Sequence, residues 1–180
     1  MRGAVRHGAS TFVFLLPWLL TFGLFSLYPL LDALYTSFTN YNPIQAGPRQ
    51  FIGLANYERL LHDPLFWKSL GNTLIFVIGT IPLTTVFALL VALGLNRRLP
   101  LKGLFRAGYF MPTIVSIVVI SLIFKNFYSP FGFFNEILKL FGLSSRAWLQ
   151  DPKTALAAVM FMDVWAAIGY YAIIYLAGLQ

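Results

Sequence analysis

Residues 69–96 read SLGNTLIFVIGTIPLTTVFALLVALGLN and contain no formally charged side chain. A hydrocarbon core about 30 Å thick is crossed by roughly 20 helical residues, so this stretch is long enough to span a bilayer. Outward from it, residues 8–31 and 107–124 are also free of formal charge, and residues 154–180 contain only Asp163. The sequence therefore predicts an all-α integral membrane protein with four transmembrane helices. Their predicted bounds are about 11–31, 70–95, 107–124 and 155–178.

The amino-acid composition agrees with this prediction. Hydrophobic residues make up 58% and charged residues 11% of the 180-residue chain. A soluble domain of this composition would lack the polar groups to cover its own surface. Four spans and their links account for nearly the whole chain, so no separate folded domain is expected outside the membrane.

Basic residues are unevenly shared among the predicted links, and they indicate the orientation. The link between the second and third spans holds four basic residues and no acid: Arg97, Arg98, Lys102 and Arg106. Cytoplasmic links carry an excess of Lys and Arg, so this link and both termini are expected on the cytoplasmic side. Links 32–68 and 125–153 then lie outside. The net charge of +7 is therefore interpreted as membrane orientation, with lipid as a partner and no nucleic acid.

Two short helices are predicted in the outer links. Asn56 can cap a helix over residues 57–61, which Asp63-Pro64 would end. In the second link, apolar residues recur at helical spacing over 134–141, and Gly142 ends the run. This second helix either lies along the outer membrane surface or packs on the ends of the spans.

Prolines interrupt the predicted spans. A proline removes one backbone hydrogen bond and its ring clashes with the preceding turn, so bends are expected at these positions. The prolines within the spans are Pro17, Pro29, Pro82 and Pro112.

Motifs for enzymatic chemistry are missing from the sequence. No Gly-rich phosphate loop with Gly-Lys-Ser/Thr occurs, so P-loop binding of ATP is not expected. His7 and His62 lie in different links, and the six carboxylates are scattered, so neither a metal site nor a catalytic residue is predicted. We therefore expect no cofactor and a transport or structural role, not an enzyme.

Asp163 is the polar residue that stands out within a span. A charged carboxylate at the centre of a membrane helix costs about 2.5–3.5 kcal/mol on insertion scales, so a partner or a wet cavity is expected. Asp163 either faces a substrate pathway, or pairs with a nearby Lys or Arg, or lies in water if the span begins later in the sequence. Trp165 and Tyr170 lie close by in sequence, and sugars present apolar faces and hydroxyl edges that aromatic rings and carboxylates can meet. Trp and Tyr also anchor helices at membrane interfaces.

Four stretches, in order along nearly the whole chain, resemble one protein family. They are LLPWLLTFGLFSLYPLLDALYTSFTNYNP (15–43), FIGLANYERLLHDPLFWKSLGNTLIFV (51–77), LNRRLPLKGLFRAGYFMPTIVS (95–116) and WLQDPKTALAAVMFMDVWAAIGYYAIIYLAGLQ (148–180). The chain resembles the permease subunits of binding-protein-dependent sugar ABC transporters of the maltose, oligosaccharide and glycerol-3-phosphate type. The resemblance implies a type I ABC importer permease fold.

The resemblance also implies partners and a site. It implies a second permease subunit, a dimer of cytoplasmic ATP-binding subunits, an extracytoplasmic solute-binding protein and a sugar substrate. The implied location is the cytoplasmic (inner) membrane of a bacterium or archaeon. Carried over from the family, the substrate-binding positions are Asp163, Trp165, Ala167 and Tyr170. The family pattern has a proline four residues after the tryptophan, where this chain has Gly169.

The family pattern continues beyond the last residues of this sequence. In the family, a cytoplasmic loop with an E-A-A…G motif docks onto the ATPase, and two further spans follow. No such ATPase-docking motif is present in this sequence. The resemblance therefore implies that residues 1–180 form a partial transmembrane domain, with its last two helices missing.

Two other functions fit a four-span protein. One is a proton-coupled secondary transporter that uses Asp163 as the proton site, and the other is a non-transporting membrane scaffold. If the chain belongs to a sugar importer, an uncharged sugar is favoured over a phosphate ester, because no basic residue lies in the predicted spans of this chain.

Overall fold

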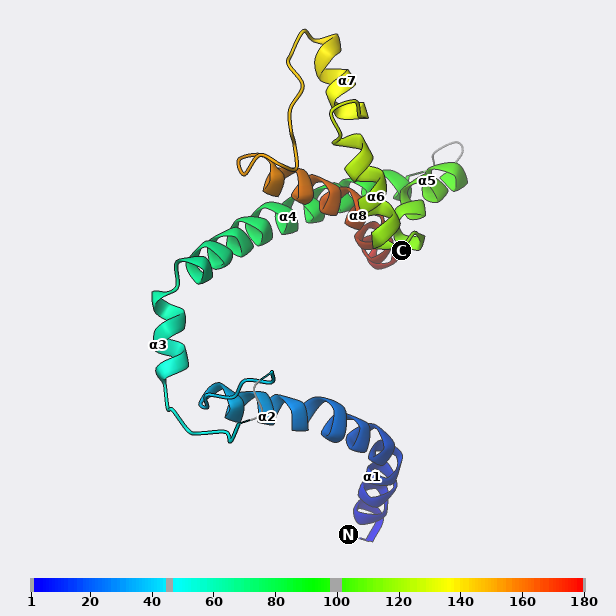
Figure 1. The fold of residues 1–180 in the computed structure, drawn as a ribbon. Coiled ribbons are helices and arrows are strands. Elements are labelled where there is room, and N and C mark those ends of the chain that lie inside the picture. The colour runs from blue at the N-terminus through cyan, green and yellow to red at the C-terminus, as the bar shows by residue number, and fades with distance from the viewer. Residues whose placement is uncertain (1, 45–46, 98–101, 180) are drawn as a thin grey trace. The chain divides into compact units, whose positions relative to one another are not determined.

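A computed structural model describes residues 2–44, 47–97 and 102–179. Part of the basic link, including Arg98, lies outside these described residues. The chain divides into two compact units, residues 1–67 and 68–180. The described elements are helices, apart from one isolated antiparallel β-bridge between Thr39 and Phe51 (Figure 1). The all-α prediction is therefore confirmed for the described part of the chain.

The first unit contains one long interrupted helix and one short one. Its elements are α1 (Arg2–Phe22), the π-helix η1 (Gly23–Leu27), α2 (Tyr28–Ser37) and α3 (Ala55–His62). The π-helical turn lies directly before Pro29, which has no N–H to donate to the carbonyl four residues earlier. The Tyr28 N–H bonds instead to the Gly23 carbonyl, five residues back. The helix thus continues through a local change of hydrogen-bond register, as π-bulges do.

The role predicted for Asn56 is wrong. The residue that caps α3 is Leu54, and no side chain bonds to the free N–H groups of this helix end. The Asn56 amide instead donates to the carbonyl oxygens of Ser37 and Thr39, each at 2.8 Å. Asn56 therefore ties α3 to the end of α2, a long-range contact that local capping rules do not include.

The second unit contains the remaining helices. They are α4 (Pro64–Asn96), α5 (Lys102–Ile114), α6 (Ile117–Phe127), α7 (Phe133–Leu140) and α8 (Ala155–Gly178). The first residues of α4 belong to the end of the first unit. The predicted stop at Asp63-Pro64 is confirmed, because α3 ends at His62. The Asp63 carboxylate then accepts a hydrogen bond from Leu65 N (2.8 Å) at the start of α4. α8 has the predicted bounds, and α4 extends beyond them at both ends.

The predicted third span is not one straight helix. Within residues 103–127, α5 and α6 meet at a bend of 101°. The break follows Pro112, whose ring disfavours a continuous helix, and Ser116 restarts the helix by accepting a hydrogen bond from Val118 N (3.3 Å). Pro17 and Pro82, by contrast, lie inside helices that continue past them.

Three helical stretches of the described residues are long and apolar enough to cross a membrane, or four if the bent pair is one span. These stretches are Thr11–Ser37, Pro64–Asn96 and Ala155–Gly178, with Gly103–Ile114 plus Ile117–Phe127 as the bent pair. The structure therefore supports a membrane protein with three or four apolar helical spans.

The second predicted link helix is present as α7, and Gly142 follows it with φ = 71°, a conformation that favours glycine. In the structure α7 packs on the ends of the spans, which is one of the two placements left open. The Phe134 ring lies 5.0 Å from that of Tyr128 at the end of α6 and 5.8 Å from that of Phe161 on α8. The Tyr128 hydroxyl in turn donates to the Ala158 carbonyl of α8 at 2.8 Å.

Candidate functional site

The predicted substrate-binding residues all lie on α8, but not on one face. Successive residues of an α-helix are rotated by about 100°. Asp163, Ala167 and Tyr170 therefore share a face, while Trp165 is rotated by about 200° from Asp163 and lies nearly opposite. The pockets around α8 divide in the same way.

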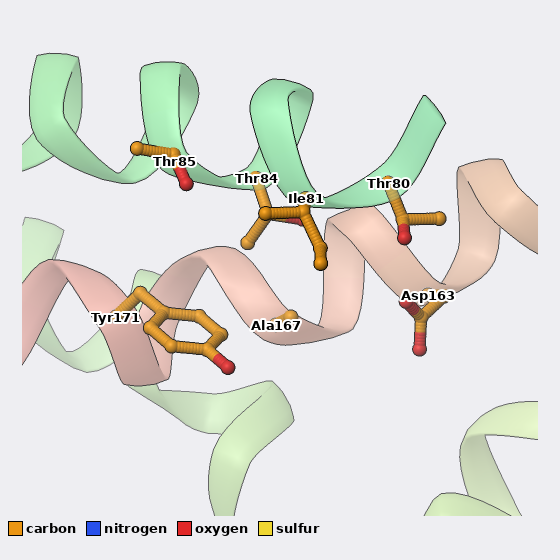
Figure 2. A pocket seen from close by; sticks show the side chains of 7 residues that line it. All are labelled: Thr80, Ile81, Thr84, Thr85, Asp163, Ala167 and Tyr171. Atoms are coloured by element: carbon orange, nitrogen blue, oxygen red, sulfur yellow. The ribbon is translucent and has the colours of Figure 1, made fainter. Parts of the chain in front are cut away.

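A polar pocket of about 290 Å³ lies between α4 and α8 (Figure 2). From α8 it is lined by Asp163, Ala167 and Tyr171, and the Tyr171 ring extends along the helix toward Ala167. The α4 side supplies three hydroxyl-bearing residues and one isoleucine. These α4 residues are Thr80, Ile81, Thr84 and Thr85.

A second pocket, of about 260 Å³, opens on the same face of α8 toward the break between α5 and α6. Asp163, Ala167 and Tyr170 line it together with Ala166. The opposite wall comes from the residues around the break: Pro112, Val115, Ile117 and Ile120. Asp163 and Ala167 therefore belong to both pockets, so the structure brings three of the four predicted residues together.

Trp165 has different surroundings. Its ring lies 5.3 Å from the Phe124 ring of α6, and it lines apolar pockets that do not include Asp163. Its side chain is 45% exposed. The structure does not bring Trp165 together with the other three predicted residues.

The electrostatics of the polar pocket are set by Asp163. This residue is only partly exposed, and the ion pairs within the described part of the chain, Arg49–Asp32 and Lys139–Glu136, do not include it. The predicted alternative, a structural pair with a Lys or Arg, is therefore not observed among the described residues. No group of three His, Cys, Asp or Glu side chains suited to a metal ion occurs in the same part of the chain.

Gly169 allows α5 to approach the site closely. A Cβ atom at this position would lie well inside contact distance of the Tyr109 carbonyl oxygen and 3.2 Å from the Thr113 Cγ2 atom, both on α5. α8 runs through Gly169 without a break. The glycine thus serves close helix packing, which is how small residues commonly act in membrane helices.

The α4 threonines were missed by sequence reasoning. Thr80 and Thr84 are 5% and 6% exposed, and their spacing of four residues places them on one face of α4. This spacing, in an otherwise apolar span, is the signal that could have identified them. Tyr171 also lines the polar pocket but was not among the predicted site residues.

No family model matches the chain. The chain is 34% identical over 174 residues to a probable ABC transporter permease protein of Bacillus subtilis, YurN. It is 35% identical over 177 residues to the lactose transport system permease protein LacF of Rhizobium radiobacter. The chain is a homologue of sugar ABC transporter permeases.

This homology covers 94% and 97% of the chain in these two comparisons, and 59% and 58% of the relatives. The permease homologue thus spans less than two thirds of the length of the curated relatives it matches. The trehalose/maltose transport system permease protein MalF of Thermococcus litoralis is 32% identical, with 97% of the chain and 59% of the relative covered. The resemblance seen in the sequence is therefore confirmed.

Solved structures support the same family. A bacterial ABC transporter involved in the import of the acidic polysaccharide alginate matches with a TM-score of 0.76 and 25% identity, over 97% of this chain and 58% of that chain. The alginate transporter in complex with an alginate pentasaccharide-bound periplasmic protein matches with a TM-score of 0.73 and 22% identity. The described helices thus resemble part of the fold of an ABC importer permease.

Two further predictions are confirmed by this relationship. The relatives are transport permeases and not enzymes, as expected for this chain. Together with the long apolar helices, the homology places the permease homologue in the cytoplasmic membrane as a multi-pass protein.

Proposed function

We propose that this chain is a permease subunit that forms half of the translocation pathway of an ATP-driven sugar importer. The observation that carries the proposal is homology along nearly the whole chain to permeases named for lactose and trehalose/maltose transport. The proposed domain is a partial ABC importer transmembrane domain over residues 1–180. Its spans number four, with α5 and α6 together as the third, and both termini lie on the cytoplasmic side.

The proposed partners follow from the same family. A second permease subunit completes the pathway, and a dimer of cytoplasmic ATP-binding subunits drives it. An extracytoplasmic solute-binding protein delivers the sugar, as the complex of the alginate transporter with a sugar-bound periplasmic protein suggests.

The proposed pathway face of α8 carries Asp163, Ala167 and Tyr170. Asp163 and Tyr170 offer a carboxylate and an aromatic ring with a hydroxyl, and the small Ala167 between them leaves room in both adjoining pockets. A carboxylate and a ring can meet the hydroxyl edge and the apolar face of a sugar at once. Trp165 lies on the other side of α8 against Phe124 and is proposed as a site residue on the family resemblance alone.

The test is uptake by cells that carry the assembled transporter, with radiolabelled maltotriose, lactose and an arabinotriose as probes. Uptake is expected to stop on ATP depletion. Asp163→Ala, Ala167→Leu and Tyr170→Ala are each expected to lower kcat/KM about tenfold, equivalent to about 1.4 kcal/mol of lost transition-state stabilisation. Leu140→Ala, on the exposed face of α7, is the control and should leave uptake unchanged.

Other results would support the other functions. Uptake that survives ATP depletion but collapses with an uncoupler would indicate a proton-coupled carrier. Normal uptake in both Asp163→Ala and Trp165→Ala would remove α8 from the pathway and leave a scaffold role.

A further inference from the structure

Asp163 shares the polar pocket with hydroxyl-bearing residues and with no cation. The pocket between α4 and α8 is lined by Asp163, three threonines of α4 and Tyr171, and none of its lining residues is Lys, Arg or His. A carboxylate in such a place needs hydrogen-bond donors from water or from a ligand. The polar groups around it therefore restrict which ligands fit.

The hydroxyl of Thr80 is already used as a donor. Its Oγ1 atom donates to the Phe76 carbonyl at 2.8 Å, so toward the pocket this oxygen can only accept. An ionised Asp163 also only accepts. Thr80 and Asp163 line the same end of the pocket, on α4 and α8 (Figure 2). A ligand bound at this end must therefore bring hydrogen-bond donors, which sugar hydroxyls supply and a carboxylate does not.

A negatively charged ligand meets a second obstacle. Its carboxylate would lie near the Asp163 carboxylate, and no basic side chain among the pocket residues would balance the two charges. The hydroxyls of Thr84, Thr85 and Tyr171 are uncharged and cannot replace such a cation. Charge repulsion and the lack of a free donor on Thr80 thus act in the same direction at this end of the pocket.

From this geometry we infer that Asp163 is a specificity-determining residue, which admits uncharged, hydroxyl-rich sugars and rejects carboxylated ones. The inference rests on the proposed sugar-import function and adds a substrate class to it. It also separates this chain from its structural relative, which takes part in the import of an acidic polysaccharide. Thr80 contributes to affinity for the accepted sugars through its acceptor oxygen.

The experiment compares two forms of one sugar, trigalacturonic acid and its trimethyl ester, which differ in charge on the same backbone. Binding is measured by saturation-transfer difference NMR on the assembled transporter in nanodiscs, without the solute-binding protein, so that only the membrane site is probed. The wild-type transporter is expected to bind the ester at least about tenfold more tightly than the acid. Asp163→Asn should reduce this ratio to about twofold or less, because the amide has a donor and no charge.

Two matched variants accompany Asp163→Asn. Asp151→Asn removes a carboxylate from the turn before α8, outside the pocket, and should leave the ratio unchanged. Thr80→Val keeps the shape of the side chain without the hydroxyl, and should weaken ester binding about threefold with the acid remaining disfavoured.

The inference is overturned if the wild type binds acid and ester equally, or if Asp163→Asn binds both with the wild-type ratio. In either case sugar binding itself is intact, so the proposed function stands. Failure of the wild type to bind either probe would also overturn the inference, because the uncharged ester should be admitted, whereas the proposed function is decided by the uptake of maltotriose, lactose and arabinotriose.

Discussion

Gly169→Ala is expected to destabilise the protein by about 2 kcal/mol or more, through the contact between α5 and α8. The added Cβ would overlap the Tyr109 carbonyl oxygen and press on Thr113. Overpacking of this kind costs about 1–3 kcal/mol and more where backbone must move, whereas alanine gains only about 1 kcal/mol over glycine in a helix. The overlap involves backbone on both helices, so it can be relieved only by separating them. The cost of overpacking therefore exceeds the gain in helix propensity.

Gly79→Ala is the matched control for this prediction. Gly79 also lies inside a long helix, α4, but a Cβ there would meet only the Cε and Sδ atoms of Met160. The end of a methionine side chain can rotate away at little cost, so the gain in helix propensity should dominate. Thermal unfolding of both variants in detergent measures the difference. Equal unfolding midpoints for Gly169→Ala and wild type would contradict the predicted overlap.

The spans were predictable because charge is excluded from the membrane core. The start of α8 follows from this, because residues 155–178 come directly after a charged turn. The bend between α5 and α6 does not follow from it. Pro112 predicts a bend at this place. The bend angle of 101° depends on Val115 leaving the helix and on Ser116 starting a new one. Hydropathy treats these residues as part of one run.

The candidate site was predictable in part, for a reason that lies in helix geometry. Asp163 was identified by its charge, and the family resemblance supplied Ala167 and Tyr170. These two residues follow Asp163 at four and seven positions, which places them on the same face. Trp165 was grouped with Asp163 by the family resemblance, although a separation of two residues turns it to the other side of the helix. The α4 threonines gave little signal because a hydroxyl in an apolar helix commonly bonds to its own backbone, as Thr80 does with Phe76.

Asparagines outside the spans show where local rules fail. Asn56 stands one residue past the start of α3, where capping rules assign it to the helix end, yet its amide bonds to residues at the end of α2. Asn135 lies on a helix whose apolar spacing predicted its bounds well, and nothing in that spacing marks it as buried. Side-chain amides reach over many residues in sequence, so their partners depend on the tertiary structure.

Asn135→Ala is expected to destabilise the link between α6 and α8, lowering its free energy of local unfolding by about 2–4 kcal/mol. Asn135 is 0% exposed, and its amide donates to the carbonyls of Ser129 (2.9 Å) and Arg146 (3.0 Å). Its Oδ1 atom accepts from Arg146 N (2.9 Å) and Trp148 Nε1 (3.1 Å). Each such bond contributes about 1 kcal/mol, and more where the abandoned partner stays buried. Hydrogen–deuterium exchange of residues 129–148 should therefore accelerate strongly.

Two further variants show whether the amide itself, and not polarity or size, holds this link. Asn135→Asp keeps an acceptor for Arg146 N and Trp148 Nε1 but turns a second acceptor oxygen toward the carbonyls of Ser129 and Arg146, so it should accelerate exchange as much as alanine does. Asn126→Ala is the control, because its exposed amide donates only to Leu122 O within α6. Unchanged exchange in Asn135→Asp would mean that the two donor bonds contribute nothing, and that the packing of Phe134 against Tyr128 holds the link instead.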